Sequence, residues 1–180
     1  KKVADLLVHL SDFFRMSVKV DRQRVELDDE LDLLDAYMEL MCYRYPSLHC
    51  EYNIDPDLGG VQVPNFILQP LVENSLLHGL KNKGYKGAVV TSAQKSGEDM
   101  LVTIMDTGSG FAEGKKEQVN SLLTNYAKQA AKLEGNSIGI LNVQKRIKLL
   151  CGQKYGLWYA ENEKGGVTAH LLLPCKEAGK

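Results

Sequence analysis

Two pairs of β-type segments, each joined by a short turn, constrain the fold of this chain more than any other sequence feature. Residues 88–94 and 100–105 flank a turn that contains Gly97, and residues 155–160 and 167–173 flank a turn with two adjacent glycines. Turns of this length join antiparallel neighbours. Helix-type segments lie before and between the pairs. We therefore expect an α+β protein, a two-layer sandwich in which helices cover one face of a mixed or antiparallel sheet.

Two helix-type segments come first in the chain. Residues 3–18 carry apolar side chains at spacings of three and four, and a second apolar stripe runs over residues 26–45 until Pro46 ends it. Two interpretations remain open: a helical hairpin within one globular core, or a dimerisation or inter-domain stalk. We assign residues 1–46 to a separate helical region and residues 47–177 to the α+β domain.

The remaining segments alternate between strand and helix patterns. Residues 49–54 alternate loosely like a strand, and Pro64 stands where a third helix could begin and run through Leu77. Residues 118–133 have a helical pattern with a weak apolar face, which suggests a mobile flap. Residues 140–150 predict the last helix.

The composition fits one domain with a helical appendage. The chain has 180 residues, is 44% hydrophobic and 25% charged, and carries a net charge of -1. This balance creates no long-range field that favours nucleic acid or an acidic membrane surface, so neither is an expected partner. No apolar run reaches the ~18 residues that cross a bilayer. Because the chain begins at Lys1 rather than Met, we expect an excised piece of a longer protein.

The cysteines favour reduced thiols over a disulfide scaffold or a zinc site. They form no CxxC pair and have no metal-ligand spacing with histidine. The four are Cys42, Cys50, Cys151 and Cys175.

Three segments could carry chemistry. The first, residues 68–79, places Glu73 and Asn74 on a helix, where consecutive side chains project about 100° apart. Both can therefore reach the edge of a cleft while the neighbouring leucines pack inward. Taken alone, the pair also fits a solvated helix face.

In the second segment a strand runs into Asp106, and Gly108 and Gly110 follow. The carboxylate leaves the sheet edge where glycines free the backbone to approach a flat ligand. A plain hairpin turn explains the same residues. In the third segment, Gly135 and Gly139 open a helix, whose free backbone N–H groups attract phosphate. This loop is neither a Walker A motif nor a Rossmann fingerprint.

Together the three segments resemble, in order and rough spacing, the N, G1 and G2 boxes of the GHKL ATP-binding fold. That superfamily contains histidine kinases, type II topoisomerases, Hsp90 chaperones and MutL. Residues 68–79, with the stretches 10–15, 25–31 and 37–45, are similar to LytS/YesM-type sensor histidine kinases. The resemblance covers about residues 3–174. It implies a GHKL two-layer α/β sandwich with a mixed sheet, preceded by the last helices of a dimerisation and phosphotransfer region.

The resemblance also implies roles for the site residues. Asn74 would coordinate the Mg²⁺ that bridges the phosphates, and Glu73 would orient the metal, its water or the acceptor. Asp106 would accept a hydrogen bond from the exocyclic amine of adenine, while Gly108 and Gly110 let the backbone close around the purine.

The phosphates of ATP would lie in the glycine-opened loop, under a lid formed by residues 112–134. His78 could approach the nucleotide, although capping or packing explains it as well. Lys145 and Arg146 are either solvated charges or lid and phosphate contacts. The residues expected at the phosphates are Gly135, Ser137, Ile138, Gly139 and Ile140.

Several positions depart from the family pattern. Leu77 stands where many histidine kinases carry a basic residue, Thr107 replaces the Asn of Asp-Asn-Gly, and Ser137 replaces the central glycine of the G2 loop. These changes bear on nucleotide affinity more than on the fold. The Asn/Asp-Pro-His-Phe acceptor motif is absent, and His9 lacks its neighbours.

The resemblance implies a cytoplasmic catalytic domain of a two-component kinase, whose full-length parent lies in the bacterial cell membrane. It would use ATP and Mg²⁺ to phosphorylate a histidine outside this fragment, and its partners would be a response regulator and its own dimer of phosphoacceptor helices. Two alternatives stay open. One is a degenerate nucleotide-binding or signalling module. The other is an ATP-hydrolysing machine, which needs a catalytic Glu where this chain has Pro70.

Overall fold

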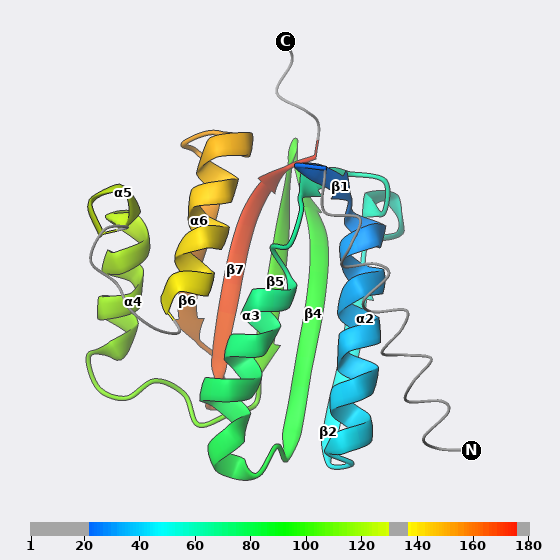
Figure 1. Cartoon of the computed structure of the whole chain (residues 1–180), viewed down its shortest axis with the longest axis vertical. Coiled ribbons are helices and arrows are strands. Elements are labelled where there is room, and N and C mark those ends of the chain that lie inside the picture. The colour runs from blue at the N-terminus through cyan, green and yellow to red at the C-terminus, as the bar shows by residue number, and fades with distance from the viewer. Residues whose placement is uncertain (1–21, 130–136, 176–180) are drawn as a thin grey trace.

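The strands of the computed structural model form a mixed sheet (Figure 1). Within the described residues, 22–129 and 137–175, the strand order is β2-β4-β5-β7-β6. Strands β2 and β4 run parallel, and the other neighbours are antiparallel. The strands are β2 (Leu48–Ile54), β4 (Gly87–Ser96), β5 (Asp99–Asp106), β6 (Gly156–Glu161) and β7 (Val167–Pro174). Both predicted hairpins are present, and the predicted strand ends shift by no more than two residues.

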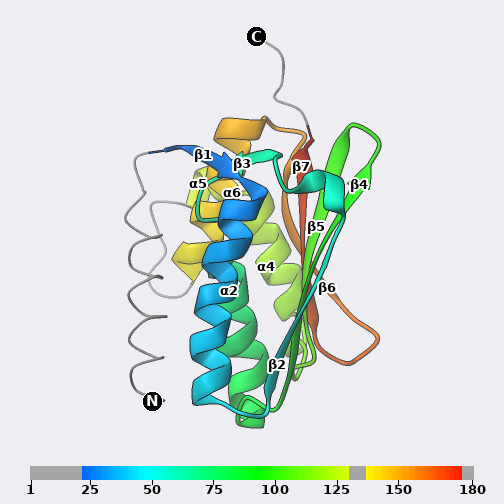
Figure 2. The same ribbon diagram turned by 90° about the vertical axis from the view of Figure 1, so that its right-hand side faces the viewer.

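The helices lie on one face of the sheet, so the molecule has two layers (Figure 2). The predicted α+β class with a mixed sheet is therefore confirmed. Among the described residues, every helix is too short or too polar to span a bilayer. The helices are α2 (Leu27–Arg44), α3 (Gln69–Asn74), α4 (Lys115–Thr124), α5 (Tyr126–Gln129) and α6 (Ser137–Cys151), with the 3₁₀ turns η1 (Pro56–Leu58) and η3 (Lys81–Lys83) and the π-helix η2 (Ser75–Leu80).

Alternation along β5 builds the sheet's share of the core. Met100, Val102 and Ile104 are completely buried, because every second side chain of a strand points to the same face. Leu34 of α2 and Ile147 of α6 are completely buried in the same cluster. These contacts fix the helical layer over the centre of the sheet.

Helix α2 matches its prediction and packs into the core of the domain. It ends at Arg44, two residues before Pro46, and acidic residues in its first turn complement the helix dipole. Its buried Leu34 and Met38 belong to the core cluster of the sheet. The earlier predicted helix, residues 3–18, lies outside the described residues. The domain boundary at residue 46 stays a prediction.

The predicted helix start at Pro64 is wrong. Pro64 instead ends the short strand β3 (Gln62–Pro64), which pairs antiparallel with β1 (Arg24–Glu26). The fixed φ of proline suits the end of a short strand as well as a first helical turn. Pairing with Arg24, which is distant in the sequence, decides between these two states. Helix α3 begins at Gln69, and Pro70 lies in its first turn.

The helical pattern over residues 118–133 is interrupted. Helix α4 ends at Thr124, Asn125 follows with a non-helical backbone, and α5 runs from Tyr126. Helix α4 packs against the rest of the domain, because only 1% of the surface of Leu123 is exposed.

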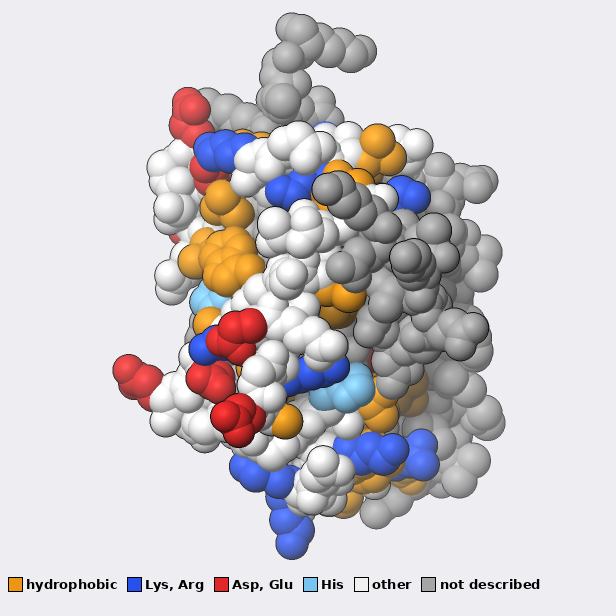
Figure 3. Space-filling model, turned by 90° about the vertical axis from the view of Figure 1, so that its left-hand side faces the viewer, with side chains coloured by type: hydrophobic (Ala, Val, Ile, Leu, Met, Phe, Trp, Pro, Cys, Tyr) orange, Lys and Arg blue, Asp and Glu red, His pale blue; other side chains and the backbone are white. Residues whose placement is uncertain are grey.

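The surface shown in Figure 3 carries charges of both signs. Acidic and basic side chains lie side by side in its lower half.

Candidate functional site

Asp106 lies at the end of β5 with only 2% of its surface exposed. Its Oδ1 accepts hydrogen bonds from the backbone N–H of Gly108 at 2.8 Å and of Val167 at 3.3 Å. Burial raises the pKa of this carboxyl, while these two amides, a hydrogen bond from Ser75 and the charge of Lys83 act to lower it. The group is thus a buried acceptor held in a fixed orientation.

Glycines at several positions allow the chain to close around Asp106. A Cβ on Gly79 would lie 2.7 Å from Oδ1 of Asp106, and one on Gly166 would lie 2.1 Å from its carbonyl oxygen. A Cβ on Gly108 would lie 2.4 Å from the backbone of Gly79, whose carbonyl oxygen also accepts from Ser109. Position 110 has a left-handed backbone with a φ of +72°, a conformation that favours glycine. Segments that are far apart in sequence therefore meet at this carboxylate.

Helix α3 brings Glu73 and Asn74 to the side of the same region. Glu73 is exposed, and its Oε1 accepts from Nε2 of Gln69 at 2.8 Å. Asn74 is half-buried, and the π-helix η2 continues directly from it. Such π-helices occur often at functional sites. The first residue of η2, Ser75, is buried and bonds to Asp106, so Asn74 and Asp106 are linked through one neighbour.

The hydroxyl of Tyr159, on β6, also lies near Asn74 and Asp106. Burial raises the pKa of its hydroxyl, the nearby Asp106 raises it further, and a contact with Asn74 lowers it. Among the residues that the structure describes, no group forms a hydrogen bond of normal geometry with this buried hydroxyl. Buried polar groups without such a partner are uncommon, and this one lies near both Asn74 and Asp106, which makes the region a candidate for binding a polar ligand.

The start of α6 approaches α3. A Cβ on Gly139 would lie 4.0 Å from Cβ of Pro70, and Ile140 is buried. The backbone of Ser137 and Ile138 belongs to the first turn of α6, whereas Gly135 lies outside the described residues. The first turn of α6 therefore lies next to the first turn of α3, the helix whose last two residues are Glu73 and Asn74.

One position that departs from the family pattern, Thr107, has a structural role of its own. Oγ1 of Thr107 accepts from the N–H of Ala88 at 2.9 Å, which extends the pairing between β4 and β5. Leu77 and His78 are exposed on η2. Arg146 is not a freely solvated charge, since its Nη1 donates to the carbonyl oxygens of Asn65 and Phe66, and the alternative of a lid or phosphate contact stays a prediction. Lys145 is exposed.

The sequence patterns missed Tyr159 and two further residues at this site, Lys83 and Asn162. Lys83 donates to the carbonyl oxygens of Thr107 and Gly108 at 2.7 and 2.9 Å, which places a cation at the glycine loop. Nδ2 of Asn162 donates to the carbonyl oxygen of Asp106 at 3.0 Å across 56 positions of sequence. The Asn-x-x-Gly turn that begins at Asn162 was a signal for its local bonds but not for this long-range contact.

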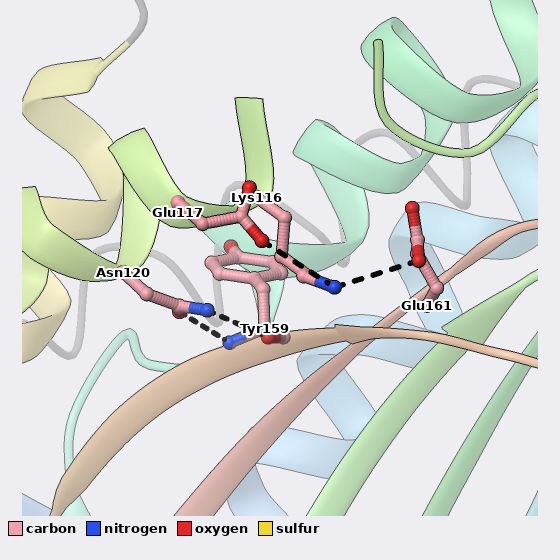
Figure 4. Close-up of polar contacts among 5 residues, drawn as sticks. All are labelled: Lys116, Glu117, Asn120, Tyr159 and Glu161. Carbon is pink, nitrogen blue, oxygen red and sulfur yellow. Dashed lines mark hydrogen bonds and ion pairs between the residues drawn. The ribbon is translucent and has the colours of Figure 1, made fainter. Parts of the chain in front are cut away.

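Helix α4 is attached to the edge strand β6 beside the site (Figure 4). The side chain of Asn120 bonds to both backbone groups of Tyr159, and Lys116 forms ion pairs with Glu117 and Glu161. The bonds from Asn120 and the ion pair with Glu161 hold α4 next to Tyr159, whose hydroxyl lies near Asn74 and Asp106. The predicted lid over residues 112–134 stays a prediction, because residues 130–136 lie outside the described part of the chain.

A pocket of about 270 Å³ opens elsewhere, and Arg22, Phe66 and Arg146 are among the residues that line it. The part of the chain that the structure describes contains no group of three His, Cys, Asp or Glu side chains that could hold a metal ion.

Two family models match the chain. The model described as "Histidine kinase-, DNA gyrase B-, and HSP90-like ATPase" matches residues 64–177, and the model described as "Histidine kinase" matches residues 1–48. Sensor protein LytS of Oceanobacillus iheyensis is 30% identical over 182 residues, which cover 100% of this chain and 30% of that protein. Sensor histidine kinase YpdA of Escherichia coli is 31% identical over 169 residues, which cover 93% and 28%. The chain thus spans less than a third of these relatives.

Solved structures share the fold. The catalytic domain of histidine kinase ThkA, in a nucleotide-free form, superposes with a TM-score of 0.62 at 15% identity, covering 86% of this chain and 97% of that one. ThkA in complex with response regulator protein TrrA gives a TM-score of 0.60 at 13% identity and covers 97% and 49%. The predicted histidine-kinase type of α+β sandwich is confirmed.

Proposed function

Because the chain belongs to the family of histidine kinase-, DNA gyrase B- and HSP90-like ATPases, we propose that it binds ATP with Mg²⁺ as the catalytic domain of a sensor histidine kinase. It donates the γ-phosphoryl group to a histidine outside these 180 residues. One observation carries the proposal: the buried carboxylate of Asp106, closed in by glycines, lies one contact away from the half-buried Asn74. ATP needs such a paired set, an acceptor for its base and a ligand for its metal.

Asp106 serves as the acceptor for adenine. A carboxylate accepts hydrogen bonds only, so it favours the exocyclic amine of adenine over the carbonyl oxygen that guanine carries at the same ring position. Its orientation is fixed before the base arrives, because two backbone amides already hold Oδ1. Gly108 and Gly110 leave the backbone beside it free of side chains that would block the ring.

Asn74 supplies the protein ligand to Mg²⁺, and Glu73 orients the metal, its water or the acceptor. Mg²⁺ typically keeps several waters and binds through one or two protein groups together with phosphate oxygens. A site without a cluster of carboxylates fits this habit, because the triphosphate contributes most of the negative ligands. Bound in this way, the metal neutralises charge on the transferring phosphoryl group.

Backbone amides at the start of α6 hold the phosphates. Gly135, Ser137, Ile138, Gly139 and Ile140 are the proposed residues. The partial positive charge of a helix N-terminus attracts anions. The lid over residues 112–134 excludes water, and His78, exposed on η2, can approach the nucleotide.

The wider assignments are proposals of the same kind. The acceptor lies in a dimer of phosphoacceptor helices, the phosphoryl group passes to a response regulator, and the domain is the cytoplasmic part of a membrane receptor. ThkA, the similar structure in complex with a response regulator protein, supports the second point. An ATP-hydrolysing machine is disfavoured, because Pro70 has no side chain that can act as a base. A degenerate nucleotide-binding module remains the second candidate, favoured by Leu77 and Thr107.

Calorimetric titration of the chain with ADP, with and without Mg²⁺, tests the proposal. We expect binding that strengthens with Mg²⁺ and a loss of that strengthening in Asn74→Ala. Phosphoryl transfer from ATP to a longer version of the protein that carries its acceptor helix then separates a kinase from a degenerate module. Absence of nucleotide binding by the wild-type chain would refute the function.

A further inference from the structure

Glu30 is a buried carboxylate that the proposed chemistry does not use. It lies on α2 with 2% of its surface exposed, and its oxygens accept three successive backbone amides. Oε1 accepts from Phe66 at 2.5 Å, and Oε2 accepts from Ile67 at 2.9 Å and Leu68 at 3.1 Å. A buried carboxylate of this kind fixes the groups that it bonds, because leaving either side unpaired is costly.

The bonded segment does not hold its own shape by regular structure. Residues 65–68 connect β3 to α3, and Phe66 has a φ of 56°, a left-handed conformation that side chains other than glycine adopt rarely. Such backbone persists where surrounding contacts impose it. Successive N–H groups in this conformation form an anion-binding concavity, and here the carboxylate of Glu30 occupies it.

Arg146 holds the same segment from the other side. Its Nη1 donates to the carbonyl oxygens of Asn65 at 2.5 Å and of Phe66 at 2.8 Å. Burial raises the pKa of the Glu30 carboxyl, and the three amides and the charge of Arg146 oppose that rise. The segment is therefore clamped between a side chain of α2 and a side chain of α6.

The clamp ends where the metal-binding helix begins. Leu68, whose N–H bonds to Glu30, is the residue immediately before α3, and α3 ends at Asn74. Helix α2 lies within the region that matches the histidine kinase model, residues 1–48, whereas α3 lies within the ATPase model, residues 64–177. Glu30 thus joins the two regions by direct bonds.

We propose that Glu30 is a positioning residue, which couples α2 to the helix that carries Asn74 through the backbone of residues 66–68. A displacement of α2 moves Leu68 and with it the start of α3, and Arg146 passes the same movement to α6. The effect of Glu30 on Mg²⁺ binding rests on the proposed function, whereas the mechanical coupling of α2 to α3 does not depend on it.

Hydrogen exchange measured by mass spectrometry tests the coupling without any nucleotide. Glu30→Gln keeps one acceptor oxygen, enough for two of the three amides, whereas Glu30→Ala keeps none. We expect faster exchange in residues 66–80 in the order wild type, Gln, Ala, with β5 and β7 unchanged. Asp32→Asn, which removes an exposed carboxylate from the same helix, is the matched control and should leave residues 66–80 unchanged.

Nucleotide binding supplies the second readout, at a temperature where every variant is folded. Glu30→Gln should weaken the Mg²⁺-dependent part of ADP affinity by between about twofold and thirtyfold, the range of coupling through packed networks, and leave adenosine affinity unchanged. If Glu30 had a merely structural role, Glu30→Gln would lower the stability of the domain but leave the strengthening of ADP binding by Mg²⁺ as in the wild type.

The outcomes separate the two proposals. Faster exchange confined to residues 66–68, with α3 and η2 as in the wild type, would overturn the coupling. Faster exchange through Asn74, in a chain that binds no ADP, would support the coupling and refute the proposed function. Equal loss of adenosine and Mg-ADP affinity would also count against a positioning role for Glu30.

Discussion

The side chain of Asn120 pairs with the backbone of Tyr159 as a neighbouring strand would (Figure 4). Nδ2 donates to the carbonyl oxygen at 2.8 Å, and Oδ1 accepts from the N–H at 2.9 Å. Within the described ranges β6 is the edge strand of the sheet, so no strand there pairs with these two groups. A helix side chain therefore both closes the sheet edge and holds α4 beside the candidate site.

Asn120→Ala should destabilise the domain, because it leaves the two backbone groups of Tyr159 without their partner. We expect a loss of about 1–3 kcal/mol in the free energy of unfolding. Urea denaturation measures it. Asn125→Ala is the matched control, since the exposed side chain of Asn125 donates to the carbonyl oxygen of Ser121 in the adjoining turn of α4 and not to the sheet. Equal stability of both variants would show that the bond to Tyr159 contributes little.

Gly108→Ala should disrupt the packing around Asp106. Its Cβ would lie 2.4 Å from the backbone of Gly79, which cannot move aside as a flexible side chain would. Overpacking of this kind costs roughly 1–3 kcal/mol or more. Gly60→Ala is the control, because nothing lies within 4 Å of the added carbon. Thermal unfolding of both variants checks the difference, and a Gly108→Ala midpoint equal to that of the wild type would contradict the close approach.

Asp106→Asn should weaken the binding of adenine nucleotides. The amide keeps one acceptor oxygen but replaces the other with a donor, which opposes the exocyclic amine of adenine. The expected loss is about 1–3 kcal/mol of binding free energy, measured by calorimetric titration with ADP and Mg²⁺. Asp99→Asn, at the other end of β5, should bind as the wild type does. Unchanged affinity of Asp106→Asn would remove this carboxylate from the adenine site.

The strands of the sheet were predicted well because the signals that define them lie within each strand and in the turns beside it. Alternating apolar residues and four-residue turns define β5 and β7 without reference to distant segments. Pro64 shows where local information ends, because its ring fits a short strand and a first helical turn equally, and only pairing with Arg24 selects the strand. The break at Asn125 was likewise invisible, since the helical composition continues through it.

The candidate site divides in the same way. Contiguous sequence motifs identified Asn74, Asp106 and Gly108 as site residues. Tyr159 and Asn162 did not, because each acts through contacts with residues that are distant in sequence. The bonds of Arg146 were not predicted for the same reason, as its partners lie 81 and 80 positions away. The roles of the site residues toward ATP and Mg²⁺ stay predictions.

His170 should make the stability of the domain depend on pH. Burial lowers the pKa of its imidazole from the usual 6.5, and its ring stacks on Trp158 with centroids 5.1 Å apart. The folded state therefore favours the neutral ring, so the unfolded state binds the extra proton as the pH falls below 6.5. The contribution of His170 to the free energy of unfolding should therefore be fully present above pH 6.5. It should decrease as the pH falls from 6.5 through the lower pKa that His170 has in the folded state. Urea denaturation at pH 7.5 and at pH 5.5 measures this loss, and His170→Gln should reduce it. If both proteins lost equal stability between these values, the imidazole would not be its source.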